Sequence, residues 1–495
     1  MSLTNKFSAL RSRLSKGPLQ QGNFVRNVLT VATGTALAQA ITIAAMPILS
    51  RMYSPAAFGL LATFVVLCDT AYQVACLGYQ GSIVLPKRDQ SAHTLWVSCI
   101  CIGIASCILA EVVFLMQGER IAAWLGNPEL EEWLWLVPVV MLIMVAFETT
   151  TYWCTRHKKF GQISTGIVSN RLAAVGTQLA LGAVSATAAP SGLLIGNVFG
   201  SLTGLSVISA QGMRNMPAHY WKNLRLRRIF LLLHRYRHFP GYGLLSNLFA
   251  AAGRALPVIC LGYFFTPAIV GFFAMSNRLV TAPIQLLSKA VVQVFYERAN
   301  RANVDGNLGE LTAGLYERMV ALIMTPMGLL GLAAPDLIAV LLGGQWIQSG
   351  VFMQWLVIWL FFVATISPLH KIFLILERQR ELAVINVVLF LVSAAALIAG
   401  GFSDDATLAI AFFAIASSFV RVGQALRVMF ITGASIRTVP STILKELLLA
   451  TPFFLAMAAT RFFFENTLIV SGAFMSLIIL FAGLRAKKII KPGRI

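Results

Sequence analysis

The chain of 495 residues has few charged side chains. Only 12% of its residues are Asp, Glu, Lys or Arg, whereas 58% are hydrophobic. A typical soluble domain has about 25% charged residues. This shortage of charge excludes an ordinary soluble domain and predicts an all-α, polytopic membrane protein.

The sequence also lacks the motifs of several enzyme classes. It contains no GxxxxGK[ST] phosphate-binding loop, no HExxH, no GxSxG and no paired CxxC. Its seven cysteines do not have the spacing of metal ligands. We therefore expect a transporter and not an enzyme, without a metal site or cofactor. Its driving force is expected to come from an ion gradient, a substrate gradient or a partner.

Long apolar runs make up most of the chain. A membrane-spanning helix needs about 20 mostly apolar residues, and about fourteen segments meet this criterion. No loop between them is long enough to form a soluble domain. The expected spans cover residues 25–49, 58–84, 91–116, 133–154, 161–185, 191–210, 241–263, 267–291, 315–335, 351–374, 382–402, 406–430, 443–463 and 467–484.

Residues 211–240 form the longest weakly hydrophobic stretch between these spans, and they include basic but no acidic residues. Lys and Arg are retained on the cytoplasmic side during membrane insertion, so we expect a cytoplasmic linker. Further basic loops alternate with loops that are poor in Lys and Arg, which predicts that both termini are cytoplasmic. The net charge of +20 is then explained by topology and by contacts with anionic lipids, not by a nucleic-acid partner.

The two ends of the chain are basic. Residues 1–24 show no cleavable signal peptide pattern, and Phe7, Leu10 and Leu14 share one helical face. This segment is expected to lie as an amphipathic helix on the cytoplasmic membrane surface. Residues 485–495 are expected to form a basic cytoplasmic tail.

The segments before and after the linker resemble each other just after their first spans. Internal repeats of this kind are typical of secondary transporters. We expect two pseudo-symmetric lobes of six helices, residues 25–210 and 241–430, around a central cavity, with two additional helices in 431–484. The matched pairs are Pro47 with Pro257, Tyr53 with Tyr263, Pro55 with Pro267, and Gly59 with Gly271.

Several arginines lie within predicted spans, although no acidic residue occurs between Glu148 and Glu297. An ionisable residue near the centre of a bilayer costs about 2.5–3.5 kcal/mol on insertion scales, so each is a candidate functional residue. The planar guanidinium group of arginine binds phosphate oxygens in pairs, which favours an anionic substrate. The candidate residues of a cationic, substrate-binding cavity are Arg26, Arg171, Arg254, Arg278 and Arg421. Arg26 and Arg421 also fit a second role, in which their side chains reach the membrane interface.

Two carboxylates within the spans are candidates for ion pairing or for coupling to H+ or Na+. Asp69 is the more central, and it fits pairing with a cavity arginine, binding of a coupling cation, or proton transfer. Glu148 lies near the inner end of its span, where Arg156 or Lys158 is the expected partner.

Four stretches resemble a known family. PILSRMYSPAAFGLLATF at 47–64 resembles the first loop and second span of bacterial polysaccharide biosynthesis proteins. These are the O-antigen and exopolysaccharide translocases of the multidrug/oligosaccharidyl-lipid/polysaccharide (MOP) flippase superfamily. The residues at 270–299, 334–356 and 367–386 are similar to later parts of the same family, and the resemblance extends over residues 25–430.

The resemblance implies a two-lobed bundle that moves an oligosaccharide on undecaprenyl diphosphate across the bacterial cytoplasmic membrane, for O-antigen, capsule or exopolysaccharide export. It also implies cationic cavity residues, with Arg26, Arg254 and Arg278 at comparable positions, and a glycan polymerase and chain-length regulator as partners. Three alternatives stay open: a cation-coupled multidrug exporter of the same superfamily, a peptidoglycan lipid flippase, and a membrane glycan polymerase.

Overall fold

The computed structural model describes residues 18–489, apart from residues 185–189, 215–216, 218, 223, 241–243 and 465. The described residues form helices, turns and loops, and none of them is in a β-strand. The predicted all-α class is therefore confirmed. The amphipathic segment expected near the N-terminus and the end of the basic tail lie outside the described residues.

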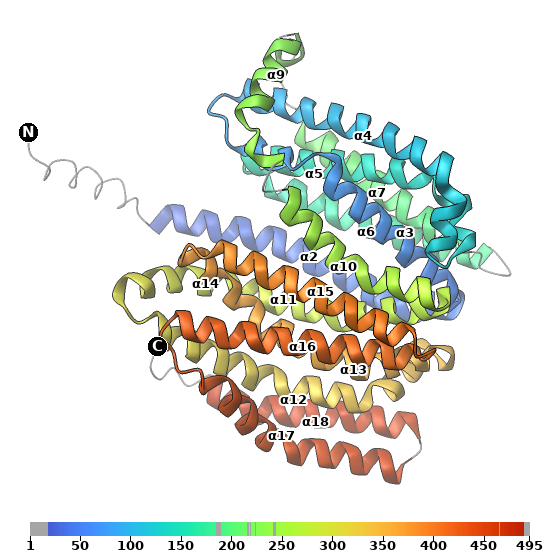
Figure 1. The fold of residues 1–495 in the computed structure, drawn as a ribbon, viewed down its shortest axis with the longest axis vertical. Coiled ribbons are helices and arrows are strands. Elements are labelled where there is room, and N and C mark those ends of the chain that lie inside the picture. The colour runs from blue at the N-terminus through green and yellow to red at the C-terminus, as the bar shows by residue number, and fades with distance from the viewer. Residues whose placement is uncertain are drawn as a thin grey trace, which may run out of the picture.

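Fourteen long helices occupy the places of the predicted spans (Figure 1). The first lobe consists of α2 (Pro18–Met52), α3 (Pro55–Ala75), α4 (Asp89–Trp124), α5 (Leu136–Arg156), α6 (Phe160–Val184) and α7 (Ser191–Gly212). The second lobe consists of α10 (Leu244–Phe264), α11 (Pro267–Asp305), α12 (Leu308–Leu342), α13 (Ile347–Ile366), α15 (Gln379–Gly401) and α16 (Ala406–Ile431), with the short α14 (His370–Ile375). The last two helices, α17 (Thr438–Phe463) and α18 (Thr467–Ile489), pack against α12.

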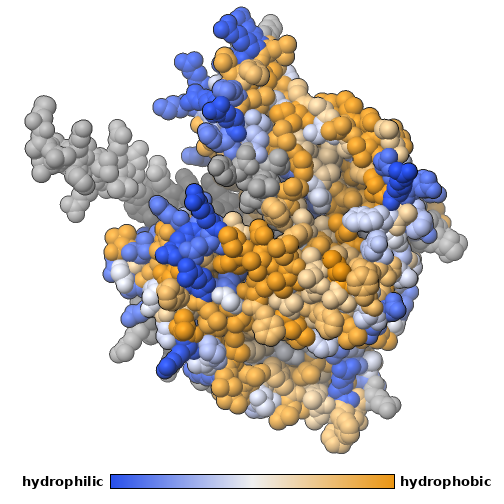
Figure 2. Space-filling model, in the orientation of Figure 1, coloured by the Kyte–Doolittle hydropathy of each residue, from blue (hydrophilic) through white to orange (hydrophobic). Residues whose placement is uncertain are grey.

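Among the described residues, twelve helices are long and apolar enough to cross a membrane by length and composition. The two long helices outside this set are α10 and α11, which stand at the predicted seventh and eighth spans. Figure 2 shows a wide hydrophobic surface over the middle of the bundle, with hydrophilic residues gathered toward its ends. The chain is thus a multi-pass membrane protein.

Successive long helices run in opposite directions, so the bundle has two distinct ends. The linker end holds the described part of residues 211–240 and both ends of the described chain, as Figure 1 shows. The short-loop end holds the turns at 53–54, 265–266 and 343–346.

Local sequence sets where the second long helix begins and ends. Ser54 is extended, and its hydroxyl oxygen accepts a hydrogen bond from the backbone N–H of Ala57, so it caps α3 just before Pro55. At the other end, Leu77 and Gly78 have positive φ angles of 49° and 78°. Left-handed residues cannot continue a right-handed helix. The predicted span at 58–84 is therefore wrong beyond Ala75, and a separate 3-10 helix covers Tyr79–Val84.

The residues matched in the repeat contact each other where the two lobes meet. A Cβ atom on Gly59 would collide with the carbonyl oxygen of Pro267, and one on Gly271 would collide with that of Pro55. Glycine allows the backbones of α3 and α11 to approach this closely. The contact is reciprocal, as expected where two related elements pack about a pseudo-twofold axis.

The linker packs against the first lobe through two short helices, α8 (His219–Lys222) and α9 (Leu226–Arg235). The Tyr79 hydroxyl donates a hydrogen bond of 3.2 Å to the carbonyl oxygen of Leu233 in α9. The ring of the fully buried His93 lies 4.8 Å from that of Trp221 in α8. The basic stretch is thus folded back on the lobe that precedes it.

Candidate functional site

Four of the predicted charged residues lie at a similar depth in the bundle. Arg171, Arg254, Arg278 and Asp69 are ten to fourteen residues from the short-loop ends of α6, α10, α11 and α3. An α-helix rises 1.5 Å per residue, so this depth is about 15–21 Å. The hydrocarbon core of a bilayer is about 30 Å thick, which places all four near its middle.

Arg171 of the first lobe and Arg278 of the second lobe line the same central pocket. Neither guanidinium group makes a hydrogen bond or an ion pair with another described residue. Their like charges act on each other electrostatically. The pocket has a free volume of about 30 Å3, which is room for one or two water molecules. Two unpaired cations therefore face a space that is too small for a sugar in this state.

Apart from Arg278, the pocket wall comes from helices of the first lobe. Asn197 of α7 and Gln178 of α6 add amide groups, and Met46 of α2 and Phe58 of α3 add apolar surface. The Gln178 side chain donates to the carbonyl oxygen of Leu193 at 3.1 Å, which fixes it between α6 and α7. The pocket thus combines two cations with hydrogen-bonding amides, a set that suits phosphate and sugar hydroxyl groups.

Asp69 and Arg254 lie on opposite lobes beside this pocket. Both side chains are exposed, although they are in the middle of long helices. The charge of Asp69 interacts most strongly with that of Arg254 and then with that of Arg171. Asp69 makes no ion pair within 4.0 Å with a described residue. The carboxylate therefore lowers the positive electrostatic potential around the pocket without forming an ion pair with a described arginine.

Arg421 lies on a different set of helices from the pocket. Its guanidinium donates to Oε1 of Gln424 at 2.8 Å and lies 3.3 Å from Nε2 of His370. These contacts join α16 to α14 inside the second lobe. The structure does not bring Arg421 together with Arg171 and Arg278. Arg26 lies near the start of α2, where side chains are outside the description.

The expected pairing of Glu148 with Arg156 or Lys158 is wrong. Arg156 instead binds Asp89 at the start of α4, at 2.7 Å. Glu148 and Arg156 are on the same helix but about 12 Å apart along its axis, at 1.5 Å per residue. Glu148 is half-buried and interacts electrostatically with the phenols of Tyr72 and Tyr152.

The two lobes are hydrogen-bonded to each other at the short-loop end. The carbonyl oxygen of Ser50 accepts from Nε1 of Trp346 at 2.9 Å and from Nε2 of Gln345. The Ser50 hydroxyl donates to the carbonyl oxygen of Leu342 at 3.0 Å. With a longer contact from Arg51, these are the hydrogen bonds between the lobes in the described part of the chain. The central pocket is therefore closed on this side.

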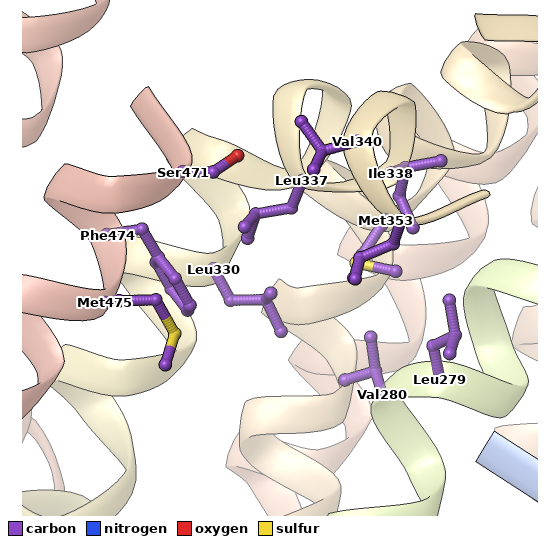
Figure 3. Close-up of a pocket in the computed structure, with 11 residues that line it drawn as sticks. Leu279, Val280, Leu330, Leu337, Ile338, Val340, Met353, Ser471, Phe474 and Met475 are labelled. Carbon is purple, nitrogen blue, oxygen red and sulfur yellow. The ribbon is translucent and has the colours of Figure 1, made fainter. Parts of the chain in front are cut away.

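A larger apolar pocket of about 360 Å3 lies to the side, between α12, α13, α11 and α18. Figure 3 shows side chains of α12 and α18 facing one another across it, among them Leu330, Phe474 and Met475. Its polar lining is limited to Ser471, whose hydroxyl has no partner among the described residues. The wall chemistry suits a hydrocarbon chain and excludes a charged group.

Sequence reasoning missed the Ser50–Trp346 contact and this side pocket. Trp346 lies within the family-like stretch 334–356, but its hydrogen-bond partner Ser50 is nearly 300 residues away. The apolar pocket left no signal, because its residues are the same types that face lipid elsewhere.

Two lobes of antiparallel helices that close over a charged mid-membrane pocket form an arrangement that is typical of secondary transporters. The family model described as polysaccharide biosynthesis protein matches residues 48–351. The chain therefore belongs to the polysaccharide biosynthesis protein family, which confirms the resemblance seen in the sequence.

Known proteins agree with this assignment. The chain is 21% identical over 320 residues to the succinoglycan biosynthesis transport protein ExoT of Rhizobium meliloti (strain 1021). That match covers 63% of this chain, and the chain spans only 61% of the relative's length.

Solved structures share the fold. A lipid II flippase MurJ in an inward closed conformation superposes with a TM-score of 0.70 at 12% identity, covering 94% of this chain and all of MurJ. A multidrug resistance MATE family transporter of the MOP superfamily gives 0.55 at 12% identity, covering 83% of this chain and 96% of the transporter. The named relatives are transport proteins and flippases, in agreement with the expectation of a transporter and not an enzyme.

Proposed function

We propose that this protein translocates an undecaprenyl-diphosphate-linked oligosaccharide across the bacterial cytoplasmic membrane, for export of O-antigen, capsule or exopolysaccharide. The observation that carries the proposal is the pairing of Arg171 and Arg278. These two cations come from different lobes, form no ion pair with a described carboxylate and line one pocket in the middle of the membrane.

The chemistry of the diphosphate requires such cations. A sugar diphosphate is too polar to cross hydrocarbon alone, because burying an unpaired charge costs many kcal/mol. Guanidinium groups in a restricted dielectric offset that desolvation and grip phosphate oxygens in pairs. Arg254 adds a third positive charge at the same depth. The negative charge of Asp69 weakens the attraction between these arginines and the diphosphate, so that the substrate can be released.

The mechanism that fits is alternating access. The lobes are joined at the short-loop end by Ser50 and Trp346, so the substrate enters from the linker end. Rocking of the lobes then breaks these hydrogen bonds and exposes the pocket to the other side. We place the linker end and both termini in the cytoplasm, because the basic loops gather there.

The lipid tail stays outside the charged pocket. The polyprenyl chain remains in the bilayer while the diphosphate and glycan pass between the lobes. The apolar pocket beside α12 and α18 supports this division, because its lining accepts hydrocarbon only.

The energy source in this proposal is either the substrate gradient or coupling to H+ or Na+. Asp69 and Glu148 are the candidate coupling groups, because both are carboxylates in the spans without an ion pair to a described residue. Partners that fit the proposal are anionic lipids, a glycan polymerase and a chain-length regulator.

The deciding experiment is mass spectrometry of polyprenyl-linked glycans in a strain without this gene, with a membrane-impermeant probe to assign the leaflet. We expect a complete repeat unit trapped on the inner leaflet, and complementation by wild type but not by Arg171→Gln or Arg278→Gln. A complete unit that reaches the outer leaflet unpolymerised would favour a polymerase. Unchanged pools would favour a drug exporter.

The fold similarity to MurJ supports a second candidate, a flippase for a peptidoglycan precursor. The same strain distinguishes the two, because that substrate would accumulate as a peptidoglycan precursor on the inner leaflet while the exported polysaccharide stays normal.

A further inference from the structure

A second cationic feature lies on the outer face of the second lobe, apart from the central pocket. A groove of about 540 Å3 runs between α15 and α16. Val384, Ile385 and Val388 form one wall and Val420 belongs to the other. Polar residues close its linker-end mouth: Arg380, Glu381, Gln424 and Arg427.

Gly423 of α16 lies in the floor of the groove. No atom lies within 4 Å of the position that a Cβ atom on Gly423 would take, and this residue is exposed. Glycine in the middle of a helix costs roughly 1 kcal/mol relative to alanine. The open floor of the groove is therefore maintained at an energetic cost.

The groove faces lipid. Both of its helices are long and apolar enough to cross a membrane. The side chains of Val384 and Val388 are 61% and 43% exposed. Eight residues separate Arg380 from Val388, so the apolar wall reaches about 12 Å into the membrane from the mouth. Figure 2 shows hydrophilic residues gathered where α15 begins, next to hydrophobic surface over α15 and α16.

The mouth has an excess of positive charge. Glu381 is held by Arg378 at 2.7 Å and by Nε of Arg427 at 2.9 Å. This leaves the terminal nitrogens of Arg427 without a described hydrogen-bond partner. Arg380 is exposed and makes no hydrogen bond or ion pair with any described residue. Among the described residues here, three arginines outnumber Glu381 and Glu377.

We propose that this groove is a binding site for a phospholipid with an anionic headgroup. The headgroup phosphate lies between Arg380 and Arg427, near the first turn of α15, where the positive end of the helix dipole also favours an anion. One acyl chain lies along Val384, Val388 and Gly423. The apolar wall requires a lipid, and the Arg380 guanidinium together with the terminal nitrogens of Arg427 selects the anionic one over a zwitterionic one.

The test is native mass spectrometry of the full chain in detergent, titrated with phosphatidylglycerol or phosphatidylcholine. We expect wild type to retain phosphatidylglycerol preferentially. Arg380→Gln is expected to weaken this binding about tenfold, as for loss of one charge-assisted hydrogen bond. Gly423→Leu, which fills the groove, is expected to weaken the binding of both lipids.

Matched controls separate the site from general effects. Arg437→Gln removes an exposed charge at the same end of the bundle but outside the groove. Gly483→Leu adds the same side chain to α18 at another open position. Both controls are expected to bind phosphatidylglycerol like wild type, and thermal unfolding without added lipid checks that all variants are folded.

Three results would overturn the proposal. Equal binding by wild type, Arg380→Gln and Gly423→Leu would show that the lipid binds elsewhere. Preferential retention of a polyprenyl phosphate would make the groove a substrate site. A change from dimer to monomer in the variants, with unchanged lipid binding, would make it a contact between two copies of the chain.

Discussion

The backbone carbonyl oxygen of Ser50 accepts a hydrogen bond of 2.9 Å from the indole nitrogen of Trp346. The bond joins the end of α2 in the first lobe to the turn after α12 in the second. Trp346 is fully buried, and the ring of Phe58 meets it edge-on at 5.2 Å. A substrate path through the short-loop end requires this contact to break.

Trp346→Phe should favour opening at the short-loop end. The change keeps a buried aromatic ring but removes a hydrogen bond that contributes about 1 kcal/mol, which is roughly fivefold in the ratio of closed to open lobes. Electron paramagnetic resonance distances between spin labels at Ala56 and Gly344, in a cysteine-free background, would report the shift. Trp359→Phe is the control, because the Trp359 indole nitrogen has no partner among the described residues. An identical distance distribution in both variants would contradict the assigned role.

Gly59→Ala and Gly271→Ala should destabilise the protein to a similar extent. Each new methyl group meets a backbone carbonyl oxygen of the other lobe, Pro267 or Pro55, and cannot be accommodated by a side-chain rotation. We expect a loss of about 1–3 kcal/mol, the usual cost of overpacking. Thermal unfolding in detergent measures it. Gly176→Ala is the control, since nothing lies within 4 Å of its Cβ position, and it should be neutral or stabilising.

Arg278→Gln should slow translocation more than Arg278→Lys. Lysine keeps the charge but binds phosphate as a point charge, whereas glutamine removes it. Loss of one charge-assisted contact, about 1.5–3 kcal/mol, corresponds to roughly ten- to a hundredfold. Flipping of a lipid-linked glycan in proteoliposomes provides the rate. Arg421→Gln should leave the rate closer to wild type, because Arg421 is engaged with Gln424 outside the pocket. A larger loss in Arg421→Gln than in Arg278→Gln would move the site to the contact between α14 and α16.

Asp69→Asn and Arg254→Gln should not be additive. Their charges interact across the lobes. The transport rate of the double variant should therefore be no lower than that of the more impaired single variant. Asp69→Asn combined with Arg461→Gln is the control, because Arg461 pairs with Asp336 in another part of the bundle. Additive losses in both pairs would indicate that Asp69 and Arg254 act independently. Loss of a response to a proton or sodium gradient in Asp69→Asn alone would assign Asp69 to ion coupling.

Most residues of the candidate site could be predicted from the sequence, but which of them lie together in the folded protein could not. Arg171, Arg254 and Arg278 stand out because charges within apolar spans are rare. The same reasoning selected Arg421, which the structure places among His370 and Gln424. Position along a span sets the depth of a charge, but only packing decides which neighbour it faces.

The ion pair expected between Glu148 and a cation close to it in sequence was predicted wrongly. Glu148 was expected to bind a cation close in sequence, yet Arg156 binds Asp89, which is 67 residues away. The chain between them forms α4 and most of α5, and their antiparallel packing brings the two ends together. Nearness in sequence along one helix does not bring side chains together once they are two turns apart.

The sequence by itself determined the class of protein, the helices and the repeat. Hydrophobicity summed over about 20 residues predicts that a span exists, which is a local property, whereas the end of α3 at Ala75 was not predicted. The tertiary structure alone decided that Ser50 meets Trp346, that Gly59 and Gly271 cross reciprocally, and that two arginines share one pocket. These contacts join residues hundreds of positions apart, because they depend on how whole helices pack and not on the order of residues within any one of them.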